Sequence, residues 1–235
     1  MSCDELAPDG RPARRRIASW SLGVLLAAGL CSCTGPTKPV TEAPKLTADG
    51  WEYLFDGKTL AGWEVPDWGG SGKVYVKDGV VHMAQGETGT GITYAKDIPR
   101  EDYEIELDAM RVEDNDFFCG LTFPVGKDPI SLILGGWNGS VTGLSCLEGM
   151  DASENETTKS IEYENGRWYH VRVRVTKARI TAWLDDEQII AVDRKERQIS
   201  IRMEVQPSVP LGIATWRTHG AAKNIRIRRL TGEEE

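Results

Sequence analysis

The stretch "WYHVRVRVTKARITAWLDDEQIIAV", residues 168–192, decides the fold. Apolar and polar side chains alternate along it in two or three short runs. In a β-strand, successive side chains point to opposite faces, so this period predicts consecutive antiparallel strands with one face toward a core.

The chain after Trp51 repeats this pattern. "KVYVKDGVVHMA", residues 73–84, predicts a hairpin, because its central Asp-Gly pair adopts positive φ at low cost. "DYEIELDAMRV" at 102–112 and "AAKNIRIRRL" at 221–230 predict further strands, and we find no convincing helical stripe. We therefore expect an all-β sandwich of two antiparallel sheets, in one domain over residues 51–232.

The N-terminus has the order of an export signal. "RPARRR" at residues 11–16 precedes the apolar run "IASWSLGVLLAAGL", which is short for a transmembrane span, and then "CSCTG". "LCSC", Leu30–Cys33, resembles the lipobox of bacterial lipoproteins. We expect a signal peptide at 1–32, a lipidated flexible tether at 33–50, and a lipid anchor on Cys33 that holds the protein to the bilayer of a bacterial cell envelope. An ordinary secretory signal or a retained membrane anchor is the alternative.

The net charge limits the classes of partner that the sequence predicts, and the cysteine content limits the possible disulfides. The formal net charge is −8 at pH 7, which argues against nucleic acid or an anionic lipid surface as a partner. Two cysteines remain beyond the expected anchor, Cys119 and Cys146. An oxidising compartment permits a disulfide between them, and two buried free thiols are the alternative.

Several segments of the domain occur in a characteristic order: "YLFDGKTLAGWEV" at 53–65, "YEIELDAMRV" at 103–112, "NGRWYHVRVRV" at 165–175 and "PLGIATWRTHGAAKNIRIRRL" at 210–230. In this order they resemble the 3-keto-disaccharide hydrolase domain family. The resemblance implies a concanavalin A-like jelly roll and a hydrolase or lyase-type activity on 3-keto-glycosides or related carbohydrates. The segment "CGLTFPVGKDPISLILGGWNGSVTG" at 119–143 departs from the family pattern, so the family's polar residues cannot be carried onto it.

The strand "EIELD" carries a row of carboxylates. Period two places Glu104, Glu106 and Asp108 on one face. The row superficially resembles the acidic strand of laminarinase-type glycosidases, in which such carboxylates are catalytic. We favour the alternative that this is the solvent face of an outer sheet, with Ile105 and Leu107 facing the core.

Two loops gather polar groups suited to a sugar. "GLSCLEGMDASENETT" at 143–158 is rich in carboxylates and amides, which pair with hydroxyls, while an aromatic face packs on the C–H surface of a sugar ring. The same oxygen-rich set suits a divalent cation such as Ca²⁺, and a solvated polar loop is the alternative. The residues expected to contact carbohydrate are Asn115, Trp137, Asn138, Asp151, Asn155 and Trp216.

The second loop, "TWRTHG" at 215–220, supplies cations. If one strand passes through it, Arg217 and His219 face the same way, and a structural histidine that caps the end of the sheet is the alternative for His219. Cleavage of a 3-keto-glycoside by loss of the C2 proton needs a base, a group that stabilises the enolate, and a donor to the leaving oxygen. We assign Asp116 or Glu148 as base, Arg217 or a bound divalent ion as electrophile, and His219 as donor.

Other classes of function stay open at this point. The same sandwich serves as a non-catalytic, lectin-like carbohydrate-binding module, here on a lipid tether, and a surface adhesion or assembly domain is a third reading. Fold alone decides none of them.

The lipobox assignment predicts the behaviour of a Cys33→Ser variant. Stable attachment requires more than one acyl chain, and acylation of Cys33 would supply them. The variant should move from the membrane fraction to the soluble fraction, as measured by immunoblotting after cell fractionation. Retention of the variant in the membrane fraction would refute the assignment.

Overall fold

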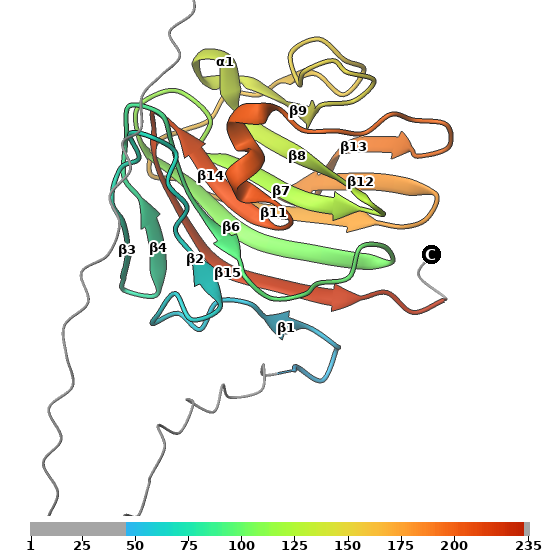
Figure 1. The fold of residues 1–235 in the computed structure, drawn as a ribbon, viewed down its shortest axis with the longest axis horizontal. Helices are drawn as coiled ribbons and strands as arrows, with labels where there is room; N and C mark the ends of the chain where they lie inside the picture. The colour runs from blue at the N-terminus through green and yellow to red at the C-terminus, as the bar shows by residue number, and fades with distance from the viewer. Residues whose placement is uncertain (1–45, 233–235) are drawn as a thin grey trace, which may run out of the picture. The chain divides into compact units, whose positions relative to one another are not determined.

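The structure, a computed structural model, describes residues 46–232. The expected signal peptide, Cys33 and the tether up to residue 45 lie outside the described residues. Within the described range, no helix is long and apolar enough to cross a membrane. Two antiparallel β-sheets pack face to face (Figure 1), and the only helical elements of this range are a turn, α1 Gly136–Gly139, and a 3-10 helix, η1 Met203–Ser208. The predicted all-β jelly-roll sandwich is confirmed.

The first sheet contains eight strands. They are β1 Glu52–Tyr53, β3 Val74–Lys77, β4 Val80–Met83, β6 Tyr103–Glu113, β11 Trp168–Val175, β12 Arg179–Leu184, β13 Glu187–Asp193 and β15 His219–Arg229. Their order is β13-β12-β11-β6-β15-β4-β3, with β1 paired to β15. The stretch 168–192 thus supplies three neighbouring strands, and Asp78 and Gly79 form the predicted positive-φ turn between β3 and β4.

The second sheet contains seven strands. They are β2 Trp63–Glu64, β5 Gly89–Tyr94, β7 Cys119–Val125, β8 Asp128–Gly135, β9 Val141–Ser145, β10 Lys159–Ser160 and β14 Gly212–Trp216. Their order is β10-β9-β8-β7-β14-β5-β2. Every residue of β5 and β7 is buried, which means that both faces of this part of the sheet are covered. Figure 1 shows η1 in front of β14 and β7.

The core lies between the sheets. Ile105 and Leu107 of β6 and Val171 of β11 are fully buried in it, as the period of two predicts. Tyr103 spans the two layers, because its hydroxyl donates a hydrogen bond to the carbonyl oxygen of Pro124 on β7, at 2.5 Å. The two sheets are therefore joined by a polar contact as well as by apolar packing.

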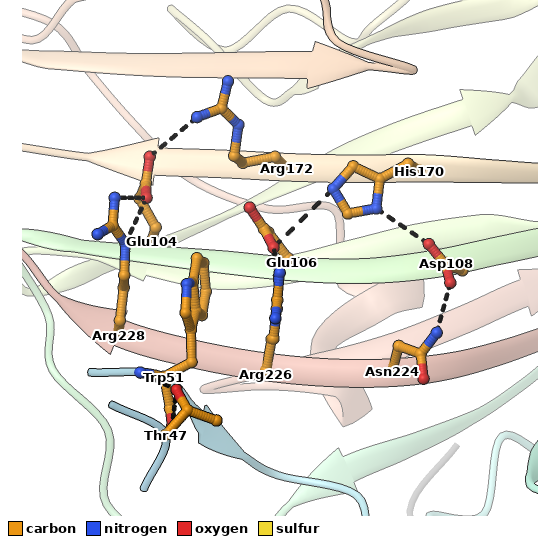
Figure 2. Close-up of polar contacts among 10 residues, drawn as sticks. All are labelled: Thr47, Trp51, Glu104, Glu106, Asp108, His170, Arg172, Asn224, Arg226 and Arg228. Atoms are coloured by element: carbon orange, nitrogen blue, oxygen red, sulfur yellow. Dashed lines mark hydrogen bonds and ion pairs between the residues drawn. The ribbon is translucent and has the colours of Figure 1, made fainter. Parts of the chain in front are cut away.

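The acidic face of β6 points away from this core, as we favoured, but Glu104 and Glu106 on it are buried. Glu104 is fully buried, and its carboxylate accepts hydrogen bonds from Nε of Arg174 and Nε of Arg228, both at 2.8 Å. Arg172 approaches the same carboxylate at 3.5 Å. β11 and β15 flank β6, so each neighbouring strand brings guanidinium groups to the buried charge (Figure 2).

The network continues along β6. Arg226 donates to Glu106 from Nε at 2.9 Å, and His170 Nδ1 lies 2.9 Å from Asp108 Oδ1. The amide of Asn224 donates to the other oxygen of Asp108 at 2.6 Å (Figure 2). The carboxylates of this row thus meet side chains of both flanking strands within the described part of the chain, as a structural network requires.

A turn at the start of the described chain covers this network. Trp51 is almost completely buried, and its ring lies 4.5 Å from the guanidinium carbon of Arg226 and 5.1 Å from that of Arg228. Thr47 holds the turn, because its hydroxyl accepts a hydrogen bond from the amide of Trp51 at 3.0 Å. Leu46 forms a β-bridge with Glu52, so residues 46–50, which we expected in the tether, join the folded unit.

The two cysteines of the domain are free thiols. Cys119 lies in the core, and its pKa is raised to about 12 by burial. Cys146 is buried near the end of β9. Of the two alternatives, the structure contains the pair of buried thiols.

The buried carboxylate predicts a large stability loss for Glu104→Gln. The variant leaves three arginines facing a neutral amide. Breaking a fully buried ion pair costs about 3–5 kcal/mol, and because these arginines are partly exposed we expect about 2 kcal/mol, measured by urea unfolding. Asp193→Asn is the matched control, since its pair with Arg179 is exposed and should contribute about 0–1 kcal/mol. Equal losses in the two variants would contradict the structural role of Glu104.

Candidate functional site

Small residues lie on the outer face of the second sheet. Ile213 of β14 faces the core, so its neighbours Gly212 and Ala214 face outward. Ala214 pairs with Gly91 of β5 on one side and with Gly120 of β7 on the other. This row leaves a shallow floor on which other segments can lie close to the backbone.

The η1 helix rests on one end of this floor. A Cβ on Gly212 would lie 2.6 Å from the carbonyl oxygen of Ser208, so only glycine admits the helix at this position. Thr93 of β5 donates a hydrogen bond from its hydroxyl to the carbonyl of Pro207 at 2.6 Å. Beside η1, Phe117 covers the floor at Gly120, where an added Cβ would lie 3.1 Å from its ring.

A hollow of about 220 Å³ lies beside η1 and Phe117. Its walls come from the β6–β7 loop, β8, α1, the ends of β9 and β14, and the segment around η1. The residues that line it are Asp116, Phe117, Ile133, Trp137, Ser145, Arg202, Glu204, Val205 and Trp216. Three of them, Asp116, Trp137 and Trp216, are among the site residues predicted from the sequence.

Aromatic rings form two of the walls. The rings of Phe117 and Trp216 stack with centroids 6.4 Å apart at an interplanar angle of 27°. Trp137 lies in α1, where its φ of 50° and the φ of 67° at Asn138 turn the chain back sharply, and its side chain is 40% exposed. An exposed indole at the mouth and a stacked pair inside suit the C–H faces of a sugar ring.

Asp116 is one of two carboxylates that line the hollow, and the other is Glu204. Burial raises its pKa, while hydrogen bonds from the amides of Phe117 and Trp137 and the charge of Arg217 oppose that rise. The Phe117 amide donates at 2.7 Å, and the Asp116 amide donates to Thr218 Oγ1 at 2.9 Å. A carboxylate held in this way has a fixed orientation and a raised proton affinity, as a general base requires.

Arg202 is the cation of the hollow. It donates to Glu204 from Nε at 3.2 Å and from Nη2 at 2.7 Å, and its Nη1 donates to Asp151. These carboxylates raise the pKa of Arg202, and Arg202 lowers that of Glu204. Asp151 also accepts a hydrogen bond from Ser145 Oγ at 3.2 Å. Asp151, predicted to contact sugar, therefore reaches the hollow through Arg202.

The other predicted residues of the 143–158 loop lie elsewhere. Glu148 is exposed and accepts a hydrogen bond from the amide of Gln198 at 3.1 Å, with Arg197 at 3.9 Å. Asn155 is buried, and its amide donates to the carbonyls of Leu144 and Asp151, both at 2.7 Å. Neither residue lines the hollow. Glu148 contacts the segment that follows β13, and Asn155 makes hydrogen bonds within its own loop. Asn115 and Asn138 are exposed and do not line it either.

The expectation of one strand through residues 215–220 is wrong. β14 ends at Trp216 and β15 begins at His219, in different sheets, because the chain turns at Arg217, whose φ is 47°. Arg217 is exposed and donates to the carbonyl of Glu87 at 2.9 Å.

The same turn carries His219 to the first sheet. Its Nε2 lies 3.3 Å from Nδ1 of His82 on β4, and His82 stacks on Tyr75 with centroids 4.9 Å apart. Burial, followed by the charge of His219, lowers the pKa of His82. His219 is thus paired with another histidine and is not among the residues that line the hollow.

The residues of the 143–158 loop do not fit a divalent cation. Glu148 faces Arg197, Asp151 faces Arg202, and the oxygen of the Asn155 amide accepts hydrogen bonds within the loop. Oxygen ligands of Ca²⁺ must converge on one point, whereas these groups diverge toward separate partners. Between residues 46 and 232, no group of three or more His, Cys, Asp and Glu is placed to hold a metal ion.

The sequence analysis missed six lining residues: Phe117, Ile133, Ser145, Arg202, Glu204 and Val205. The segment "IRMEVQPS" at 201–208 has no strand or helix period, and this gave no reason to place it over a sheet. A signal was available in its composition, since Arg202 and Glu204 are two residues apart in an irregular segment that contains a proline, Pro207.

Solved structures share this fold. A candidate glycosyl hydrolase from Parabacteroides distasonis has 16% sequence identity, with 78% of this chain and 95% of that chain covered at a TM-score of 0.52. The Crh5 transglycosylase in complex with NAG has 12% identity, with 80% and 87% covered at a TM-score of 0.54. The exoplasmic domain of VIP36, bound to Ca²⁺ and Man3GlcNAc, has 11% identity, with 81% and 92% covered at a TM-score of 0.52. Sequence identities this low show only that the fold is shared.

Among curated proteins, none matches the sequence. The family described as the 3-keto-alpha-glucoside-1,2-lyase-like domain matches residues 50–228, a range that begins beside Trp51 and ends within β15. This range contains both sheets and every residue that lines the hollow. The chain therefore belongs to the 3-keto-alpha-glucoside-1,2-lyase-like domain family.

Proposed function

We propose that the hollow binds a glycoside and that the protein cleaves 3-keto-glycosides by elimination, with Asp116 as the base. The observation that carries this is a half-buried carboxylate of raised pKa between the aromatic walls formed by Phe117, Trp137 and Trp216. Membership of the family supports the choice of substrate. As expected from Cys33, we place this activity at the bacterial cell envelope.

The chemistry starts at C2 of the oxidised sugar. A ketone at C3 acidifies the C2 proton, and Asp116 removes it, so that the electrons of the C2–H bond form an enolate. When the enolate collapses, C3=O forms again, a C1=C2 double bond forms, and the C1–O bond breaks. The leaving oxygen takes a proton from the protonated Asp116. Addition of water to the C1=C2 bond then completes a net hydrolysis.

Arg202 is better placed than Arg217 to stabilise the enolate oxygen. It lines the hollow, whereas Arg217 is exposed and donates to the carbonyl of Glu87. Nη1 and Nη2 of a guanidinium each carry two hydrogens, so Arg202 retains donors besides those given to Asp151 and Glu204. A fixed donor at a site of developing negative charge is worth several kcal/mol in a dry site and less at an open mouth.

A carbohydrate-binding module is the second candidate function. The 40% exposure of Trp137 favours it, because an indole at an open rim is a platform that a lectin needs and a closed active site does not. The two functions differ in one observable, which is whether a bound 3-keto-glycoside is broken.

The proposal predicts that Asp116→Asn lowers turnover of a 3-keto-glycoside by about 10²–10⁴-fold. Sugar release should be followed by chromatography, with binding of an unoxidised glycoside kept within a few fold. In the wild type, kcat/KM should rise with pH as Asp116 loses its proton, and its midpoint should lie above the ordinary pKa of 3.8 because burial raises it.

Glu148→Gln provides the comparison with the other base that the sequence suggested. Glu148 does not line the hollow, so this variant should keep most of the activity. Loss of turnover in Glu148→Gln but not in Asp116→Asn would show that the base is assigned wrongly. A wild-type protein that binds 3-keto-glycosides and leaves them intact would establish the binding module instead.

A further inference from the structure

The guanidinium of Arg202 is surrounded by carboxylates. Glu204 accepts from Nε and Nη2, which form one edge of the planar group, and Asp151 accepts from Nη1. Each of the three nitrogens therefore has a carboxylate partner. Arginine binds a ligand carboxylate most strongly through two parallel hydrogen bonds from one edge. Glu204 already occupies such an edge in this hollow.

The charges of the residues around the hollow also disfavour a ligand that carries a carboxylate. Two carboxylates, Asp116 and Glu204, and one guanidinium, that of Arg202, line it, and Asp151 adds a further carboxylate to the same guanidinium. A ligand that enters this hollow meets more negative than positive charge. The remaining hydrogens on Nη1 and Nη2 can still donate to a neutral hydroxyl or carbonyl oxygen.

We propose that the hollow accepts neutral glycosides and excludes sugar acids, and that Glu204 is the residue that determines this specificity. The inference rests on the proposed binding of a glycoside in the hollow and adds the substrate class. A site can discriminate by an unfavourable contact with the wrong ligand as well as by a favourable contact with the right one. Glu204 provides the unfavourable contact, since it repels a carboxylate and occupies the arginine edge that would bind it.

Glu204 suits this role better than Asp151. Asp151 also accepts hydrogen bonds from Ser145 and, at 3.4 Å, from Cys146, so its removal would disturb β9 and its loop. The Glu204 side chain is 47% exposed, and Arg202 is the partner of its carboxylate. An exposed pair of this kind contributes little to folding, and its substitution should leave the sandwich intact.

The test compares two ligands that differ in one charged group, methyl glucoside and methyl glucuronide. Neither carries a 3-keto group, so binding is measured without turnover, by calorimetry or by the fluorescence of Trp137 and Trp216. Wild-type protein should bind the glucuronide at least about tenfold more weakly than the glucoside. Glu204→Gln should bind the glucuronide about tenfold more tightly than the wild type does, so that the ratio of glucuronide affinity to glucoside affinity rises.

Glu156→Gln is the matched control. Glu156 is also an exposed carboxylate paired with an arginine, at 2.8 Å from Arg197, and it does not line the hollow. The variant changes the net charge of the protein by the same amount as Glu204→Gln and should bring no gain for the glucuronide. The gain in Glu204→Gln should also shrink as salt is raised, because an exposed electrostatic contact is screened.

Two outcomes would overturn the inference. One is wild-type protein that binds methyl glucuronide as tightly as methyl glucoside, and the other is a Glu204→Gln variant that gains no glucuronide binding or gains no more than Glu156→Gln. A failure of the proposed elimination would be recognised separately, as absence of cleavage of a 3-keto-glycoside. That result leaves the comparison of the two binding affinities unchanged.

Discussion

The buried carboxylate of Glu104 is the constraint on which the first sheet depends. An ionised group that is fully removed from water is unfavourable unless opposite charges and hydrogen bonds surround it. Arg174 and Arg228 meet that requirement from the strands on either side, and Trp51 lies over Arg228. Register follows from this, because a shift of β11 or β15 by one residue would turn its arginines into the core.

This network also explains how the two faces of the sandwich divide their roles. On the first sheet, long charged side chains and Trp51 fill the outer face and leave little room for a ligand. On the second sheet, Gly212 lets Ser208 of η1 lie close to the backbone, and side chains from η1, α1, β8 and β9 line a hollow beside it. The carboxylates of the acidic strand are paired with arginines, a histidine and an asparagine, whereas the hollow lies on the other sheet.

The fold could be predicted from the sequence because it rests on local patterns. The alternation in 168–192 and the Asp-Gly turn at 78–79 each specify a strand pair without knowledge of the rest of the chain. The burial of Glu104 could not be predicted, because it depends on which strands flank β6, and Arg228 is 124 residues away from it. The two-residue period of a strand predicts toward which face of the sheet a side chain points. It does not predict which residues cover that face.

The site could be predicted only in part, for the same reason. Asp116, Trp137 and Trp216 follow or end strands, and strand ends gather at the edge of a sheet. Arg202 and Glu204 belong to an irregular segment, which is held against the sheet by the packing of Ser208 on Gly212 and by the hydrogen bond from Thr93 to Pro207.

In the 143–158 loop, residues of the same chemical type have different roles. Its carboxylates were predicted as one set, yet they diverge to different partners: Glu148 to Gln198 and Arg197, and Asp151 to Arg202. Asn155 holds the loop in shape through hydrogen bonds to carbonyl groups, and this shape fixes where Asp151 stands. Because Asp151 and Glu204 together hold Arg202 at the hollow, the loop acts on the site by orienting a cation from another segment. The carboxylates of a polar loop can therefore set the chemistry of a site without lining it, and the composition of the loop alone does not distinguish the two roles.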